Sequence, residues 1–296
     1  MSLQTLKRGF VLHRRDYRNT SLLLEVFVAE EGRLACVAKG AKSAPRGRSA
    51  LAAILQPFQP LWLGWAGRGE VKTLTRAEAA APSIALTAER LYCGFYLNEL
   101  LMRLLNREDP HEALFVFYQQ ALADLVTEPL DTVLRRFELR LLEELGYALD
   151  LQHDRQGEPI DPARYYGYSP DSGLQPVPDV GGSRLSLSGA AVAEDSPSPL
   201  STAGRTFPEP ADTRAMSTGD SASDPTRNRL CAAGAAGAAA MPGVLISGVT
   251  LERLASGTAL QRSDTLAARA LMRAALAPHL GPKPLRSREL FRRPLR

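Results

Sequence analysis

Four cations follow one another in a short stretch without any acid, and a phosphate group is the natural partner of such a cluster. The stretch 33–48 reads RLACVAKGAKSAPRGR and begins as an alternating apolar run. It then breaks into a loop rich in glycine and proline. The cations of this loop are Lys39, Lys42, Arg46 and Arg48. A basic loop that follows a strand suits the backbone of a nucleic acid, although the same residues also suit a solvated surface loop.

Two further groups of basic residues extend this pattern. Arg14, Arg15 and Arg18 lie in the polar connection 14–19 expected between the first two strands, beside Tyr17, whose ring can stack on a base. The C-terminal group consists of Lys283, Arg286 and Arg288. Both groups are candidates for nucleic-acid binding, and for each the alternative is a solvated charge.

The charge is divided unevenly along the chain. Residues 1–80 carry 13 Lys and Arg against 6 Asp and Glu, a net of +7, and residues 262–296 carry 9 against 2, again +7. Residues 81–261 carry 14 against 24, a net of −10. Two basic ends around an acidic middle indicate an anionic partner that both ends meet.

The sequence contains no residue set typical of an enzyme or a cofactor site. Residues 40–43 resemble the end of a phosphate-binding loop, but the upstream glycine and the Gly-Lys pair are missing. Glu143 and Glu144 fit a solvated helix face better than an acid–base pair. The three cysteines are scattered and the four histidines are not at ligand spacing, so we expect neither a disulfide framework nor a metal. The expected protein is not an enzyme and has no cofactor.

The elements that must position the basic residues are predicted from periodicity. Strands are expected at 9–13, 21–29, 33–38, 58–65 and 70–75, and five short strands in such a span match a closed barrel of the OB type. From residue 83 the apolar period becomes helical. Helices are expected at 87–106, from Asp109-Pro110 to about 126, from Pro129 to Gly146, at 250–255, from Asp264 to before Pro278, and at 288–292.

The predicted class is therefore α+β, with an OB-type five-stranded β-barrel followed by a mainly α-helical domain. Residues 1–80 form the expected DNA-binding domain, and residues 81–180 the first part of the helical domain, which ends in a small hairpin. Residues 181–243 are rich in Gly, Ser, Ala and Pro and are expected to be a disordered insert. Residues 244–296 complete the helical domain with a basic tail. No signal peptide or membrane span is evident, so we expect a cytoplasmic, nucleoid-associated protein.

Several separated blocks, in this order, resemble the RecO family of bacterial recombination mediators. They include FVLHRRDYRNTSLLLEVFVAEEGRLACVAKGAK, LQPFQPLWL, GRGEVKTL, LYCGFYLNELLMRLL, LRRFELRLLEELGY and KPLRSRELFRR. The resemblance covers about 1–177 and 244–296. It implies binding of single- and double-stranded DNA, annealing of complementary strands, and action with RecR to load RecA onto DNA coated by single-strand binding protein.

One departure from the family concerns metal. Some RecO-like proteins carry a four-cysteine zinc site after the helix that ends here in LGY, but residues 149–155 read LDLQHDR. We therefore expect no zinc.

The same resemblance implies a receptor for the acidic C-terminal tail of single-strand binding protein. Such a receptor needs a cation beside an apolar pocket. The candidates are Arg135, Arg136, Tyr92 and Phe95, with Arg135 expected to receive the terminal carboxylate. The alternative is that Arg135 pairs with Glu138 or Glu99 or faces solvent. For the whole protein, the alternative function is an RNA- or protein-binding OB module without annealing activity.

Overall fold

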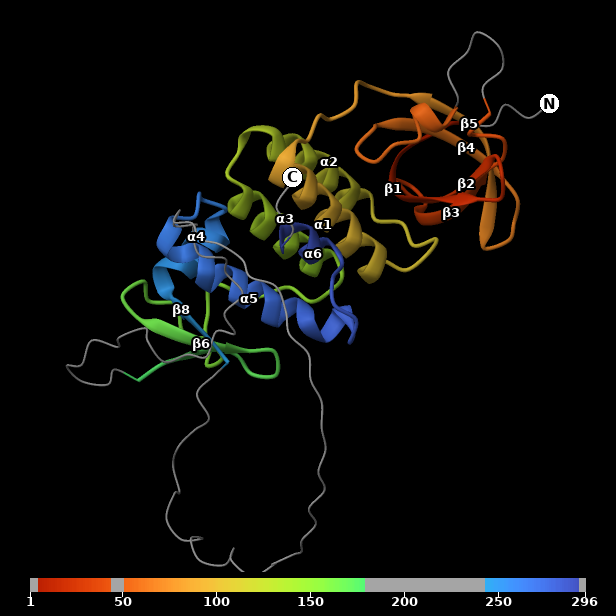
Figure 1. Ribbon diagram of the computed structural model, residues 1–296. Coiled ribbons are helices and arrows are strands. Elements are labelled where there is room, and N and C mark those ends of the chain that lie inside the picture. Colours follow the sequence, from red (N-terminus) through yellow and green to blue (C-terminus); the bar gives the residue numbers. More distant parts are fainter. Residues whose placement is uncertain (1–4, 44–50, 179–242, 293–296) are drawn as a thin grey trace, which may run out of the picture. The chain divides into compact units, whose positions relative to one another are not determined.

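Five strands of the N-terminal part close into a barrel (Figure 1) in the computed structural model, which describes residues 5–43, 51–178 and 243–292. They are β1 (Lys7–Tyr17), β2 (Ser21–Val28), β3 (Gly32–Ala38), β4 (Leu61–Ala66) and β5 (Val71–Ala79). Their order around the barrel is β1-β2-β3-β5-β4, and only β3 and β5 pair in parallel. Successive side chains of a strand point to opposite faces of the sheet. The even-numbered residues of β2, from Leu22 to Val28, point inward and are buried in the barrel core. The predicted OB-type barrel is confirmed.

The outer face of β1 and β2 packs against helices. The described residues up to Val177 and from Gly243 onward belong to one compact unit. Phe10 and Phe27 point away from the barrel core and lie 5.6 and 5.4 Å, centroid to centroid, from Phe115 of α2 (Glu112–Thr127). The Asn98 amide of α1 (Ala88–Leu104) donates to the Leu12 carbonyl at 2.9 Å. Phe10 and Phe27 on the second face of these strands therefore support the helical domain.

The β2–β3 turn sits against the chain that follows α1. Gly32 has a φ of +70°, and a Cβ there would lie 1.8 Å from the carbonyl oxygen of Asp109. Only glycine combines that conformation with so close an approach. Arg33 donates to the Met102 carbonyl at 2.6 Å, and Lys72 pairs with Glu108 at 2.9 Å. These contacts cover the end of the barrel that carries the β2–β3 turn.

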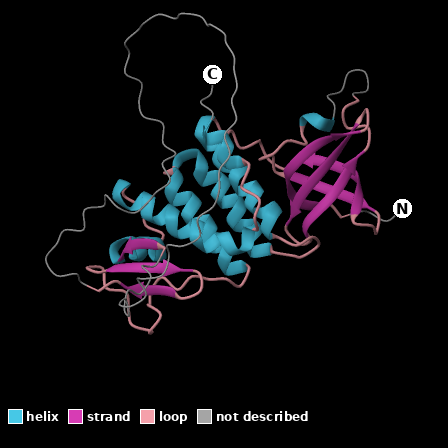
Figure 2. Ribbon diagram, turned by 60° about the horizontal axis from the view of Figure 1, so that its bottom comes forward, coloured by secondary structure: helices cyan, strands magenta, loops and turns pink. Residues whose placement is uncertain are grey.

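The helical part is assembled from segments on both sides of residues 179–242. Helix α3 (Leu130–Glu144) packs against α2 and α5 (Arg262–Leu280). Strands β6 (Tyr165–Ser169), β7 (Gly173–Pro176) and β8 (Val244–Ser247) form a sheet in the order β7-β6-β8 (Figure 2). Helices α4 (Gly248–Ser256) and α6 (Ser287–Arg292) and the short 3-10 helix η1 (Leu51–Ala53) complete the described elements. The sheet joins the predicted hairpin to a strand far away in the sequence.

Three local predictions were wrong. Strand β1 runs to Tyr17 and not to residue 13, because Arg14, Arg15 and Asp16 still pair with β2 although the apolar alternation has ended. Helix α2 begins at Glu112, after His111, so Asp109 is not its N-cap. Helix α5 passes through Pro278 to Leu280, although the proline has no N–H to donate to the carbonyl of Ala274.

Two further predictions, both on α5, were also wrong. Leu266, expected to point inward, is 76% exposed, whereas Leu271 is buried. Asp264 is not the N-cap but the third residue of the helix, and it forms a capping box with Gln261. The helix therefore starts two residues before Asp264, and its buried face includes Ala268, Leu271, Met272 and Ala275.

Several further predictions concern cysteines, membranes and the insert. Cys36 and Cys93 are free and buried, and burial raises the pKa of each thiol to about 12. Within the described ranges no helix combines the length and the apolar character that a bilayer crossing requires. Cys231 and the predicted insert lie outside the described residues.

Candidate nucleic-acid interface

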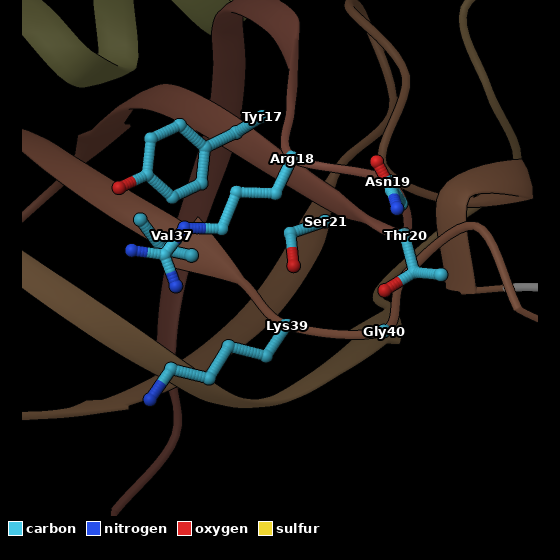
Figure 3. A pocket seen from close by; sticks show the side chains of 8 residues that line it. All are labelled: Tyr17, Arg18, Asn19, Thr20, Ser21, Val37, Lys39 and Gly40. Atoms are coloured by element: carbon cyan, nitrogen blue, oxygen red, sulfur yellow. The ribbon is translucent and has the colours of Figure 1, made fainter.

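A hollow of about 420 Å³ opens on the barrel where the β1–β2 turn meets the end of β3. Figure 3 shows its lining, with the side chains of Arg18 and Lys39 extending in the same direction and the Tyr17 ring beside Arg18. The described lining residues are Tyr17, Arg18, Asn19, Thr20, Ser21, Val37, Lys39 and Gly40. None of them is acidic, so two cations and an aromatic ring share a site without a competing carboxylate.

Strand register brings these residues together. Tyr17 of β1 lies opposite Ser21 of β2, and Leu23 lies opposite Val37 of β3. Since Cys36 and Ala38 are buried in the barrel core, Val37 and Lys39 point to its outer face. The outer face of these strands and the turn between β1 and β2 is the surface with which OB folds bind oligonucleotides. Sequence reasoning missed Ser21 and Val37, and only the pairing register would have found them.

Arg18 has an unusual backbone conformation. Its φ of +54° lies in the left-handed region, which glycine and asparagine occupy far more readily than arginine. The turn has only three residues, because β1 extends to Tyr17 and β2 begins at Ser21. The guanidinium carbon lies 5.3 Å from the centroid of the Tyr17 ring, a cation–π distance. The turn thus holds the cation against an aromatic ring at the edge of the hollow.

The neighbouring cations are more constrained. A second hollow, of about 190 Å³, is lined by Arg14, Arg15, Asp16, Leu22, Lys42 and Ala52. Lys42 pairs with Asp16 at 3.2 Å, and Arg14 donates to the Ala52 carbonyl at 3.0 Å. Arg15 is exposed. Arg14 therefore holds the segment around η1, and the charge of Lys42 is partly compensated. Arg46 and Arg48 lie outside the described residues.

The C-terminal basic residues lie on a segment that is docked on α1. The Glu99 carboxylate accepts hydrogen bonds from the backbone N–H of Arg286 at 2.9 Å and from that of Ser287 at 2.8 Å. Arg103 donates to the carbonyls of Lys283 and Pro284. The side chains of Lys283 and Arg286 are exposed and that of Arg288 is half-buried. None of these three basic residues appears in the described lining of either hollow.

Replacing Glu99 by glutamine is expected to lower the free energy of unfolding by about 1–2 kcal/mol, because two backbone donors lose a charged acceptor. Burial opposes the charge of Glu99, but the bonds from Ser287 and Arg286 outweigh it and hold its pKa below 4.5. The stabilisation is therefore present above the ordinary carboxyl pKa and is lost as the pH falls through the lowered value. Denaturant titration of both proteins at neutral and acidic pH measures it. A difference that grows toward low pH would contradict this account.

The residues predicted to bind a partner tail are largely engaged within the helical part. Arg135 is only 7% exposed and pairs with the fully buried Glu138 at 2.9 Å, so the structure shows the ion-pair alternative. Arg136 bonds to Asp124 at 2.5 Å and Glu128 at 2.9 Å. Phe95 packs on Phe58 with centroids 5.2 Å apart, and Phe95 and Tyr92 are both half-buried. Of the two arginines only Arg136 offers substantial surface, with 38% of its side chain exposed.

In residues 150–158, where some RecO-like proteins carry zinc ligands, aspartate side chains accept hydrogen bonds from backbone N–H groups. Asp150 Oδ1 accepts from the N–H groups of Gln152 and His153 at 2.9 and 3.0 Å. Asp154 Oδ1 accepts from those of Gln156 and Glu158 at 2.8 and 3.0 Å. In the described part of the chain no three His, Cys, Asp or Glu side chains gather as possible metal ligands. These carboxylates therefore act as turn acceptors.

Comparison with known proteins agrees with the barrel and the helical part. The profile "Recombination protein O N terminal" matches residues 1–83, and "Recombination protein O C terminal" matches residues 86–194. Relatives named DNA repair protein RecO occur in Methylococcus capsulatus, 51% identical over 59% of this chain and 72% of the relative, and in Nitrosospira multiformis, 48% identical over 64% and 79%. A third, in Nitrosococcus oceani, is 38% identical over 97% of this chain and 92% of its own length. The chain belongs to the RecO family of DNA repair proteins.

Proposed function

We propose that this protein is a DNA-binding recombination mediator. It anneals complementary strands and, together with RecR, helps to load RecA onto DNA coated by single-strand binding protein. The tail of that coating protein is the proposed contact of the helical part, with the more exposed Arg136 as its cation.

The observation that carries this proposal is the acid-free hollow formed by Tyr17, Arg18 and Lys39. Cations that neutralise phosphates release condensed counterions, which favours binding without any dependence on sequence. An exposed aromatic ring adds stacking, which every base can provide. Exposed Arg15 beside the hollow extends the positive surface along β1.

Annealing follows from the same physics. Two complementary strands repel each other through their phosphates, and a protein that neutralises part of this charge lowers the barrier to their encounter. No base-specific contact is needed, so the sequence preference of annealing should be weak.

The test is annealing of complementary oligonucleotides, both naked and coated with single-strand binding protein. The native protein is expected to accelerate both reactions. The double variant Arg18→Ala/Lys39→Ala is expected to slow both, because it loses phosphate contacts. Arg136→Ala is expected to slow the coated reaction selectively, because its defect lies in the contact with the coating protein.

Arg273→Ala is a matched control, since it removes an exposed cation of α5 that lines neither hollow. It should leave both rates unchanged. No acceleration by the native protein would refute the annealing proposal. A clear preference for RNA over DNA strands of the same sequence would instead favour an RNA-binding module.

A further inference from the structure

We infer that the hollow between the β1–β2 turn and the end of β3 is a subsite for one unpaired nucleotide of a single strand. The base stacks on Tyr17, and the adjoining phosphate binds between Arg18 and Lys39. This inference rests on the proposed DNA binding, but it adds a distinction between unpaired and paired DNA that charge alone does not make.

The size and lining of the hollow suit a nucleotide. Its volume of about 420 Å³ lies within the range of roughly 300–1,000 Å³ found for small-ligand sites. Asn19, Thr20 and Ser21 supply amide and hydroxyl groups, and Figure 3 shows Ser21 between Arg18 and Lys39. The Tyr17 ring can thus stack on the face of a base, and the small polar side chains can bond to a base edge or a sugar. The two cations, Arg18 and Lys39, can bind the phosphate.

The conformation of Arg18 supports a role in binding. A non-glycine residue with positive φ costs on the order of 1 kcal/mol or more, and glycine at the same place would not. The strained residue, Arg18, both contacts the ring of Tyr17 and supplies one of the two cations of the hollow. Tyr17 itself is 37% exposed although it is a large aromatic residue, so this residue is accessible from solvent at the edge of the hollow.

The geometry favours a single strand because of where bases lie in a duplex. Paired bases are stacked on each other and cannot place a face on an external ring without leaving the helix, which costs a few kcal/mol. Phosphates are equally available in both forms. Loss of the ring should therefore affect single strands selectively, whereas loss of the cations should affect both forms.

The experiment compares binding of an oligothymidylate and of a duplex of equal length by the full chain. Tyr17→Leu is expected to weaken single-strand binding about tenfold, with an unchanged salt dependence and duplex affinity within about twofold. Tyr17→Phe, which keeps the ring, should bind like the native protein. An oligonucleotide with one 5-iodouracil should form a photo-crosslink to Tyr17 that disappears in Tyr17→Leu.

A second variant separates binding from folding. Arg18→Gly relieves the left-handed strain, so its melting temperature should rise by a few degrees while its affinity for single strands falls. The subsite is refuted if Tyr17→Leu weakens single strand and duplex equally or changes neither. If the native protein binds neither DNA, the proposed function itself fails, so the two failures are distinguishable.

Discussion

Replacing Arg135 by alanine is expected to lower the free energy of unfolding by about 3–5 kcal/mol, the usual cost of leaving a buried charge without its partner. Glu138 is fully buried, and its Oε1 accepts from Arg135 at 2.9 Å and from the Tyr96 hydroxyl at 2.5 Å. Without Arg135, the Glu138 carboxylate keeps the hydrogen bond from the Tyr96 hydroxyl but loses its charged partner. Chemical denaturation of the two proteins measures the difference.

The penalty should depend on pH in a defined direction. Burial raises the pKa of Glu138, and Arg135 opposes that rise. In Arg135→Ala the opposing charge is gone, so Glu138 binds a proton more tightly in the folded state than in the unfolded chain. Stability that depends on this proton is complete below the ordinary pKa of a glutamate and is lost as the pH rises through the raised value. The cost of Arg135→Ala should therefore be larger at pH 8 than at pH 5.

Arg140→Ala is the control on the same helix. Arg140 pairs with Glu143, both side chains being about half exposed, and its guanidinium lies 5.0 Å from the centroid of the Phe117 ring. Contacts this exposed contribute little, so its loss should change stability by about 1 kcal/mol or less. Equal effects of the two substitutions would contradict the account. Arg135→Ala is also a poor test of the proposed receptor for the tail of single-strand binding protein. Weaker binding of the tail by this variant could result from unfolding as well as from a lost contact. Arg136→Ala is the cleaner probe.

The second large effect concerns DNA. Arg18→Ala/Lys39→Ala is expected to weaken single-strand binding about 100-fold at low salt, because each charge-assisted contact contributes about 1.5 kcal/mol or more. The slope of log affinity against log salt should become shallower by about 0.7 for each phosphate contact that is lost. Fluorescence anisotropy with a labelled oligonucleotide over a salt series gives both quantities.

The control for this variant is a pair of exposed arginines on the helical part, Arg155→Ala/Arg273→Ala, which changes the net charge equally. It should reduce affinity only slightly, through the long-range field. An unchanged salt slope in Arg18→Ala/Lys39→Ala, or an equal loss in the control pair, would show that the hollow does not hold the strand.

Short-range patterns were sufficient for much of the architecture. The alternation from Leu22 to Val28 identified a strand with one face in a core, and the barrel type followed from the number and length of such strands. The same alternation failed at Arg14–Tyr17, where polar side chains continue a strand through backbone hydrogen bonds. Periodicity detects which face is buried, and it loses a strand once neither face is apolar.

Long-range contacts could not be inferred in the same way. Phe27 lies on the face of β2 that points away from the barrel core, and its ring packs on Phe115, which is far along the chain. Likewise, Arg135 was predicted to face a partner because its chemistry suits a carboxylate, and the structure pairs it with Glu138, a turn away on its own helix. Residue type indicates what a side chain can bind, whereas burial decides what it does bind.

The amino-acid sequence by itself determined the barrel class, the helical part, the basic character of the β1–β2 and β3 ends and, through its ordered blocks, the RecO family. Only the tertiary structure decided which of the basic residues share a site. Strand register placed Arg18, Lys39 and Tyr17 around one hollow. Side-chain contacts engaged Arg14 and Lys42 within the barrel, and hydrogen bonds to Glu99 docked the C-terminal segment on α1. The physical reason is that propensity and alternation act between near neighbours in the chain, whereas pairing register and ion pairs depend on residues that folding brings together.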